Sequence, residues 1–394
     1  MGWFLKIRHF QTYSIGFEGP FLCQKFILDR CDLFYIFIYL YGCQESEVSK
    51  YNKEKQISVN FYEDSFGSAK IKNVITLENT IEGYIGRVER IFLDNNRIYI
   101  LDGMRRKMML FDDLGQHLHT VSTGKGPGEL VHPSDFEYTK EDKTILIWDL
   151  AGIKLESYDQ DLNYLGNKLK KDNIILAHWF IHTADEKWVT YNGSTLSQDG
   201  NDYFTYVLRN SNFNPIRGLL PFGKDWEDYT TIYNPFSREM KDEILLCRRD
   251  NNNIYYYNAE KGELSLKYYI DFGLHQFPDN SDLSTILELH KTGKAALILG
   301  DIINSMDYFA LSSTFKSRQE YFIYQKSRGN VRSSLAINDL PYGVLKGMVN
   351  EDTFILIVDP IDYLEFIDAH ETDAPKLEGL KEDDNYLLVL FTIE

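Results

Sequence analysis

Cysteine and proline are both scarce in this chain. The 394 residues include 4 cysteines, and Cys23, Cys31 and Cys43 all lie near the N-terminus. Only Cys247 remains for the rest of the chain, so a disulfide-stapled scaffold is excluded there. Proline accounts for 10 residues, which leaves few interruptions to the hydrogen-bonded ladder of a β-sheet.

Basic residues are also fewer than acidic ones. The chain has 42 Lys and Arg and 59 Asp and Glu, which gives a formal net charge of −17. Nucleic-acid binding needs a basic face that displaces counterions from phosphate, so we expect no nucleic-acid partner. Electrostatic docking on anionic lipid is disfavoured for the same reason. Aromatic residues, by contrast, are abundant, with 27 Tyr and 25 Phe, and this composition favours β-strands.

The sequence has no apolar run long enough to span a bilayer, which needs about 20 residues. Its longest, Leu33–Tyr41, has nine residues and is followed by Gly42, Cys43 and a polar stretch. This arrangement resembles a bacterial lipoprotein signal, although Tyr41 is bulkier than the residue usual at that site. The resemblance implies cleavage before Cys43 and lipidation of Cys43, with residues 1–42 as the signal segment and 43–56 as a lipid-anchored tether. The alternative is a buried first strand in a cytoplasmic protein.

The body of the chain contains a repeat. Residues Ile91–Leu118 and Phe136–Leu165 align at a shift of 47, which superposes Asp102 on Asp149. Both segments alternate apolar and polar side chains with period two, as half-buried strands do. We therefore expect Arg97–Asp102 and Thr144–Asp149 to be inner-blade strands, each followed by a second strand and a hairpin turn.

Weaker copies of the same pattern continue to the C-terminus and bring the count to six units. The later copies are Lys187–Leu220, Glu243–Gly273, Tyr308–Leu335 and the segment from Thr353 to Ile393. Six such units favour an all-β fold, a six-bladed β-propeller over residues 57–394. We expect the strand at Ala69–Leu77 to complete the C-terminal blade and so close the ring. A β-sandwich or two separate β domains are the alternatives.

Several segments resemble the six-bladed β-propeller lipoproteins of Bacteroidota, which are related to NHL-repeat propellers. The resemblance rests on IYILD (98–102), GKGPGE (124–129), TILIWD (144–149), YIDFG (269–273) and DDNYLLVL (383–390). It implies the propeller fold and a place in the cell envelope, with lipid anchoring in the outer membrane. The chain departs from the family at Asn385-Tyr386, where Asn-Pro is usual.

The glycine-rich stretch Gly124–Glu129 is not a phosphate-binding loop. It lacks the Gly-Lys-Ser/Thr ending of a P-loop, Pro127 removes one N–H donor, and a strand rather than a helix follows. We interpret it as a crossover between two blades, on the face where propellers usually bind ligands. On this interpretation the ligand-binding side chains are Lys125, Glu129, His132 and Asp135.

No complete catalytic motif is present. A Gly-x-Ser-x-Gly elbow is absent, and Cys247 lies in an apolar stretch typical of a packed thiol rather than a nucleophile. The repeated Asp102 and Asp149 suit a hydrogen-bonding element between blades better than a catalytic pair. The nine histidines are scattered, so we expect no catalytic residue, no metal and no cofactor.

These observations favour a non-enzymatic binding protein of the cell envelope. We expect a monomeric propeller that presents one face to a glycan, a peptide or an envelope protein and attaches to the membrane through its lipid. The first alternative is a lyase or hydrolase with its active site at the mouth of the propeller channel, which rests on fold-level analogy. A scaffold subunit of an outer-membrane complex is a further alternative.

Overall fold

The computed structural model describes most of the chain from Lys55 onward. The described residues are 55–62, 68–94, 96–139, 142–169, 177–196, 203–222, 234–240, 242–248, 251–278, 281–316, 318–334, 339–370 and 374–393. The predicted signal segment 1–42 and the predicted lipidation site Cys43 lie outside them.

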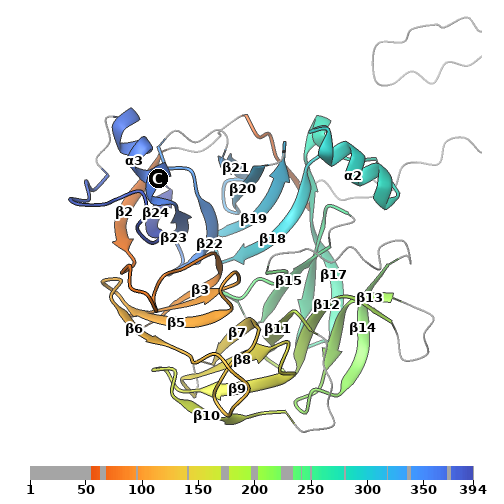
Figure 1. The fold of residues 1–394 in the computed structure, drawn as a ribbon. Coiled ribbons are helices and arrows are strands. Elements are labelled where there is room, and N and C mark those ends of the chain that lie inside the picture. Colours follow the sequence, from red (N-terminus) through yellow and green to blue (C-terminus); the bar gives the residue numbers. More distant parts are fainter. Residues whose placement is uncertain are drawn as a thin grey trace, which may run out of the picture. The chain divides into compact units, whose positions relative to one another are not determined.

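The body of the chain, which begins at Lys50, contains six four-stranded sheets arranged as a six-bladed β-propeller (Figure 1). The first blade consists of β3 (Val88–Asp94), β4 (Arg97–Asp102), β5 (Lys107–Asp112) and β6 (His117–Thr120). The second consists of β7 (Pro133–Thr139), β8 (Thr144–Asp149), β9 (Lys154–Tyr158) and β10 (Tyr164–Asn167). The third consists of β11 (Trp179–His182), β12 (Trp188–Leu196), β13 (Tyr203–Arg209) and β14 (Pro215–Phe222). The predicted all-β propeller is thereby confirmed.

The other three blades use strands from both ends of the body. The fourth contains β15 (Glu243–Cys247), β16 (Asn253–Asn258), β17 (Glu263–Asp271) and β1 (Gln56–Ser58). The fifth contains β18 (Leu297–Asn304), β19 (Tyr308–Phe315), β20 (Arg318–Gln325) and β21 (Asn330–Ser333). The sixth contains β22 (Val344–Met348), β23 (Phe354–Val358), β24 (Leu387–Ile393) and β2 (Ala69–Thr76). Because β2 pairs antiparallel with β24, the predicted closure of the ring is also confirmed.

The expected inner-blade strands are β4 and β8, which are the second strands of their blades. The strands β3 and β7, which were not predicted from the sequence, precede them on the channel side. β4 and β8 are prominent in the sequence because most of their residues are apolar and nearly all are buried between sheets. The innermost strands β3 and β7 carry charged residues toward the channel, which weakens the apolar pattern that marks a strand.

The repeated aspartates hold the connections between blades, as expected. The carboxylate of Asp102 accepts hydrogen bonds from the backbone N–H groups of Gly86 and Arg87, at 2.7 and 3.1 Å. Asp149 accepts from the N–H groups of Val131 and His132 at 3.0 and 2.7 Å. Each aspartate thus satisfies the backbone just before its blade's first strand, where a buried N–H would otherwise lack a partner.

The N-terminal segment forms a strap across three blades, which the sequence did not indicate. Strand β1 pairs in parallel with β17 of the fourth blade. Beyond it, the buried ring of Phe61 stacks on Phe272 at 5.5 Å and on Phe315 of the fifth blade at 4.6 Å between ring centroids. The chain then reaches the sixth blade as β2. The described parts of the strap therefore contact the fourth and fifth blades as well as supplying the outermost strand of the sixth.

The innermost position of the fourth blade is irregular. There Phe236 forms an isolated antiparallel bridge with Leu246 of β15, so residues 234–240 stand where the other blades have a full strand. Pro235 has no N–H to donate to a ladder, and Asn234 has a φ of 32°, outside the range of a strand. This segment directs Arg238 and Glu239 into the channel.

Two α-helices occur in the described residues, both as insertions in connections. Helix α2 (Leu283–Lys291) is capped by Asp282, and helix α3 (Pro360–Ala369) is capped by Asp359. Neither is long and apolar enough to cross a membrane. Successive strands within a blade are antiparallel, so the connections between blades and those from second to third strands share one face. We call this the crossover face, and both helices lie on it; the opposite face is the hairpin face.

Candidate functional site

Four charged side chains form a buried cluster in the channel. Arg90 of β3 donates through Nη1 to Asp135 Oδ1 at 2.6 Å, and its Nη2 lies 3.4 Å from Glu137 Oε2. Arg238 donates from the irregular segment of the fourth blade to Asp135 Oδ2 at 2.8 Å and to Glu137 Oε2 at 2.6 Å. Two guanidinium groups and two carboxylates therefore neutralise one another across three blades.

The backbone completes this cluster. Asp135 also accepts hydrogen bonds from the N–H groups of Phe136 and Phe180, both at 2.8 Å. Arg238 donates to the carbonyl oxygen of Phe180 at 2.9 Å, which brings in the third blade. Burial, and next the neighbouring Arg238, lower the pKa of Arg90. A buried cluster of this kind is costly to break, because removing one member leaves an unpaired charge away from water.

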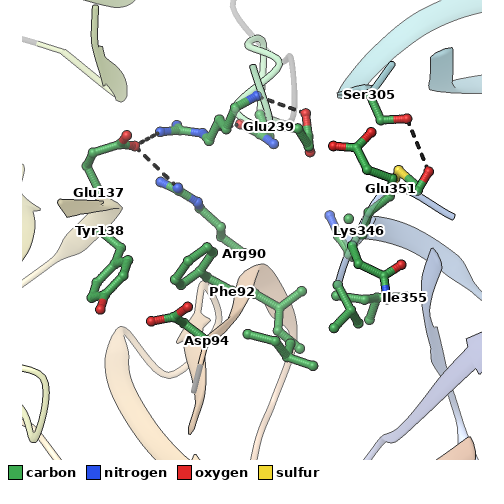
Figure 2. Close-up of a pocket in the computed structure, with 18 residues that line it drawn as sticks. Arg90, Phe92, Asp94, Glu137, Tyr138, Glu239, Ser305, Lys346, Glu351 and Ile355 are labelled. Atoms are coloured by element: carbon green, nitrogen blue, oxygen red, sulfur yellow. Dashed lines mark hydrogen bonds and ion pairs between the residues drawn. The ribbon is translucent and has the colours of Figure 1, made fainter. Parts of the chain in front are cut away.

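A cavity of about 230 Å³ lies on the hairpin side of this cluster (Figure 2). Its wall combines Phe92, Tyr138 and Ile355 with carboxylates. Glu239 accepts from the N–H of Asn304 at 3.0 Å, and Glu351 accepts from the N–H of Met306 at 3.1 Å, so the end of β18 holds both acids. Burial within the ring raises the pKa of Glu239.

A buried ion pair lies in the wall between this cavity and the other half of the channel. Lys346 of β22 donates to Asp301 Oδ2 of β18 at 2.9 Å, and Asp301 is 2% exposed. Asp301 follows Gly300, where β18 is bulged, and has a φ of 48°. Burial raises the pKa of Asp301, while Lys346 opposes that shift. Lys346 lines the cavities on both sides.

A second cavity, of about 240 Å³, opens on the crossover face; we call it the crossover cavity. The start of β3 contributes Arg87 and Glu89, the start of β22 contributes Tyr342, and helix α3 contributes Asp362. Burial, and next Asp359, raise the pKa of Asp362. The residues that line this cavity come from the first, fifth and sixth blades, so a ligand here would contact three blades at once.

The four residues predicted to bind a ligand occupy different environments. Lys125 is exposed on the crossover loop. Glu129 accepts a hydrogen bond from the N–H of Gly126 at 2.8 Å and so stabilises its own loop. The imidazole of His132 has a pKa lowered by burial and next by Arg106. Asp135 lies in the closed cluster, away from the other three, and ligand binding by any of them stays a prediction.

Sequence reasoning missed the channel residues Arg90, Glu137, Arg238, Asp301 and Lys346. A signal for some of them exists, because Arg90 directly precedes the apolar residues Ile91–Leu93 and Glu137 stands between Phe136 and Tyr138. Charged residues inside an otherwise buried strand are rarely left unpaired. That signal indicates pairing, but it does not name the partner.

Two other kinds of chemical site were considered in the sequence, a cysteine nucleophile and a metal centre. Cys247 is fully buried in β15, and burial raises the pKa of its thiol, as expected for a packed side chain. In the part of the chain that the structure describes, no group of three or more His, Cys, Asp or Glu side chains could hold a metal ion.

The protein is a six-bladed β-propeller with one cavity on the hairpin side of the channel and another on the crossover face. The chain belongs to the family described as a domain of unknown function, DUF4934, whose model matches residues 50–392. This membership and the fold confirm the predicted kinship with the six-bladed propellers of Bacteroidota.

Solved structures show the same fold. A protein from Bacteroides fragilis, whose name calls it exported, matches 86% of this chain and 99% of its own, with 15% identity and a TM-score of 0.71. A member of the DUF4221 family from Bacteroides vulgatus matches 84% of this chain and 99% of its own, with 8% identity and a TM-score of 0.54. The comparison with curated proteins finds no match.

Proposed function

We propose that this protein is a non-enzymatic binding protein of the cell envelope, which holds a glycan, peptide or protein ligand on its crossover face. The proposal rests on one observation: the cations of the channel are paired with carboxylates, whereas the crossover face has a cavity that a ligand could enter. The channel cations Arg90 and Arg238 are committed to buried ion pairs. The crossover face instead offers a cavity lined by three blades and framed by helix α3.

The proposal of an envelope location rests on two observations. The segment Leu33–Cys43 resembles a lipoprotein signal, and the structurally similar protein of Bacteroides fragilis has a name that calls it exported. We propose that Cys43 carries the lipid that attaches the protein to the outer membrane. A monomeric propeller on a short tether would then present its crossover face to ligands.

The alternative is a lyase or hydrolase. Four carboxyl groups have a pKa raised by burial, as an acid catalyst would need. They occupy different places: Glu239 lies in the hairpin-side cavity, Asp301 in the channel wall, Asp362 in the crossover cavity, and Glu320 in a smaller cavity beside it. An active site needs its acid and base to converge on one substrate, and among these places the crossover cavity, where Asp362 lies with Asp359 and Glu89, is the one where a lyase or hydrolase would act. Conversion of a bound ligand would distinguish this alternative from binding.

The test is a screen of residues 44–394, which contain the complete propeller, on glycan, peptide and envelope-protein arrays. We expect a ligand that binds and is recovered chemically unchanged. The double variant Arg87→Ala with Asp362→Ala should weaken its binding about tenfold or more. The control Met306→Ser changes an exposed side chain on the hairpin face and should leave binding unchanged. Equal effects of both variants, or a converted ligand, would contradict the proposal.

A further inference from the structure

A third cavity lies beside the crossover cavity, and we call it the side cavity. Its volume is about 210 Å³, and Arg318, Glu320, Ser334 and residues 340–343 contribute to its wall. Tyr342 and Gly343 line both the side cavity and the crossover cavity. The two cavities therefore adjoin at Tyr342, on the face where the proposed function places a ligand.

Glu320 presents an unsatisfied acceptor to the side cavity. The residue is 1% exposed, and its Oε2 accepts a hydrogen bond from Ser334 Oγ at 2.5 Å. Its Oε1 is buried and accepts no hydrogen bond; Arg318 Nε lies 3.7 Å away, which is too long for one. A buried acceptor without a donor is costly, and a donor group of a ligand in this cavity would satisfy it.

Tyr342 supplies an aromatic surface next to that acceptor. Its side chain is 42% exposed, and its hydroxyl lies 3.4 Å from the carbonyl oxygen of Gln319, to which it donates. The guanidinium carbon of Arg318 lies 4.7 Å from the centre of the ring. The ring is thus held in place between the two cavities. On the crossover side, Gln319 Nε2 is a buried donor without an acceptor.

The charges favour a neutral ligand. Arg318 at the rim and the buried carboxyl of Glu320 stand side by side, with Arg318 Nε 3.7 Å from Glu320 Oε1, so a ligand of either charge would be attracted by one of them and repelled by the other. A simple apolar group would leave Glu320 Oε1 and Gln319 Nε2 unsatisfied. A pyranose sugar meets all of these conditions, because its hydroxyls both donate and accept and the C–H groups of its ring face can pack on an aromatic ring. The cavity is also small enough to suit a single sugar unit rather than a larger ligand.

We propose that the side cavity binds one neutral sugar unit of a glycan, with a hydroxyl donating to Glu320 Oε1 and the ring face packed on Tyr342. This inference rests on the proposed function and names the ligand class for the same face. The adjoining crossover cavity would hold the next unit, and Gln319 would donate to one of its hydroxyls.

The experiment uses an array of neutral oligosaccharides of glucose, galactose, mannose, xylose and N-acetylglucosamine, with cationic, anionic and neutral peptides beside them. Residues 44–394 are applied, and the saccharide with the strongest signal is titrated by isothermal calorimetry. We expect a saccharide to bind, and Glu320→Gln and Tyr342→Ala each to raise its Kd about tenfold or more. Tyr164→Ala removes another partly exposed tyrosine, on the second blade, and should raise the Kd less than twofold.

The outcomes separate this inference from the proposed function. If peptides bind at the crossover face and saccharides do not, the sugar site is wrong and the proposed function stands. If a saccharide binds with the same Kd to all four proteins, the side cavity is not its site. If no saccharide, peptide or envelope protein binds, the proposed function fails together with the inference. Because Glu320→Gln keeps the shape of the side chain, it remains informative even if Tyr342→Ala destabilises the fold.

Discussion

The N-terminal strap makes a quantitative prediction, because its largest buried side chain, Phe61, packs at the junction of two blades. Phe61 is 1% exposed and stacks on Phe272 and Phe315, at the junction of the fourth and fifth blades. Strand β1, directly before it, has only three paired residues. A strand this short is held only weakly by its own pairing, so its position depends on the buried side chains Ile57, Val59 and Phe61, of which Phe61 is the largest.

We expect Phe61→Ala to lower the free energy of unfolding by about 3–5 kcal/mol, the usual cost of removing a buried phenylalanine ring. The backbone amides of Gln56–Ser58 should also exchange their hydrogens much faster. Urea unfolding measures the first effect, and hydrogen–deuterium exchange measures the second.

The neighbouring Tyr62 provides the control. It is 57% exposed and contacts Lys316 through its hydroxyl at 2.6 Å. Exposed contacts of this kind contribute little, so Tyr62→Ala should cost less than about 1 kcal/mol. If the two variants lose equal stability, or if Phe61→Ala leaves the exchange of β1 unchanged, the strap does not depend on this aromatic stack.

Three further predictions concern the channel, the histidines and the anchor. Asp135→Asn should lower the free energy of unfolding, measured with urea, by about 3–5 kcal/mol, because Arg90 and Arg238 lose their shared carboxylate. The control Asp113→Asn changes an exposed side chain and should change the free energy of unfolding by less than about 0.5 kcal/mol. Equal effects of the two variants would refute the role of the cluster. Partial burial lowers the pKa of His117 below its ordinary value of 6.5, so the unfolded state binds more protons and stability should fall as pH decreases through about 6.5. His117→Gln should reduce that loss between about pH 7.5 and about pH 5.5, and an unchanged loss would contradict the assignment. Cys43→Ala should abolish palmitate labelling and release the protein from the membrane fraction; persistent labelling would refute the anchor.

Local patterns in the sequence were sufficient to predict the propeller fold. Strands such as Thr144–Asp149 are apolar over most of their length, and the turn residues that follow recur at a fixed spacing. The repeated Asp102 and Asp149 were predictable for the same reason, because each acts within its own blade. Closure by Ala69–Thr76 was predictable because a ring of this type needs a partner for its last edge strand.

The strap and the channel cluster depend on contacts between distant parts of the chain. Strand β1 has three residues, and its partner β17 lies more than 200 residues away, so no local periodicity marks the pair. Arg238 is separated from Asp135 by 103 residues, and only the ring brings them together. The two helices were not predicted from the sequence, although Asp359 followed by Pro360 is a typical helix start and marks the beginning of α3.

The candidate site, too, is only partly visible in the sequence. The sequence led us to expect ligands on the crossover face, which stays a prediction, and it directed attention to the loop at Lys125 rather than to the crossover cavity. Glu320 and Tyr342 gave no sequence signal, because a glutamate in a strand and a tyrosine in a loop are both ordinary. Their significance comes from an acceptor left unsatisfied inside a cavity.

The most direct test of the account is to locate the bound ligand by hydrogen–deuterium exchange, with and without the compound that binds in the array screen. A ligand on the crossover face should protect Arg318–Glu320 and residues 340–343, which line the cavities there. The hairpin-face residues 348–351 and Ser305, which line the opposite cavity, should exchange as before. Protection confined to the hairpin face would contradict the central claim that this propeller binds its ligand on the crossover face.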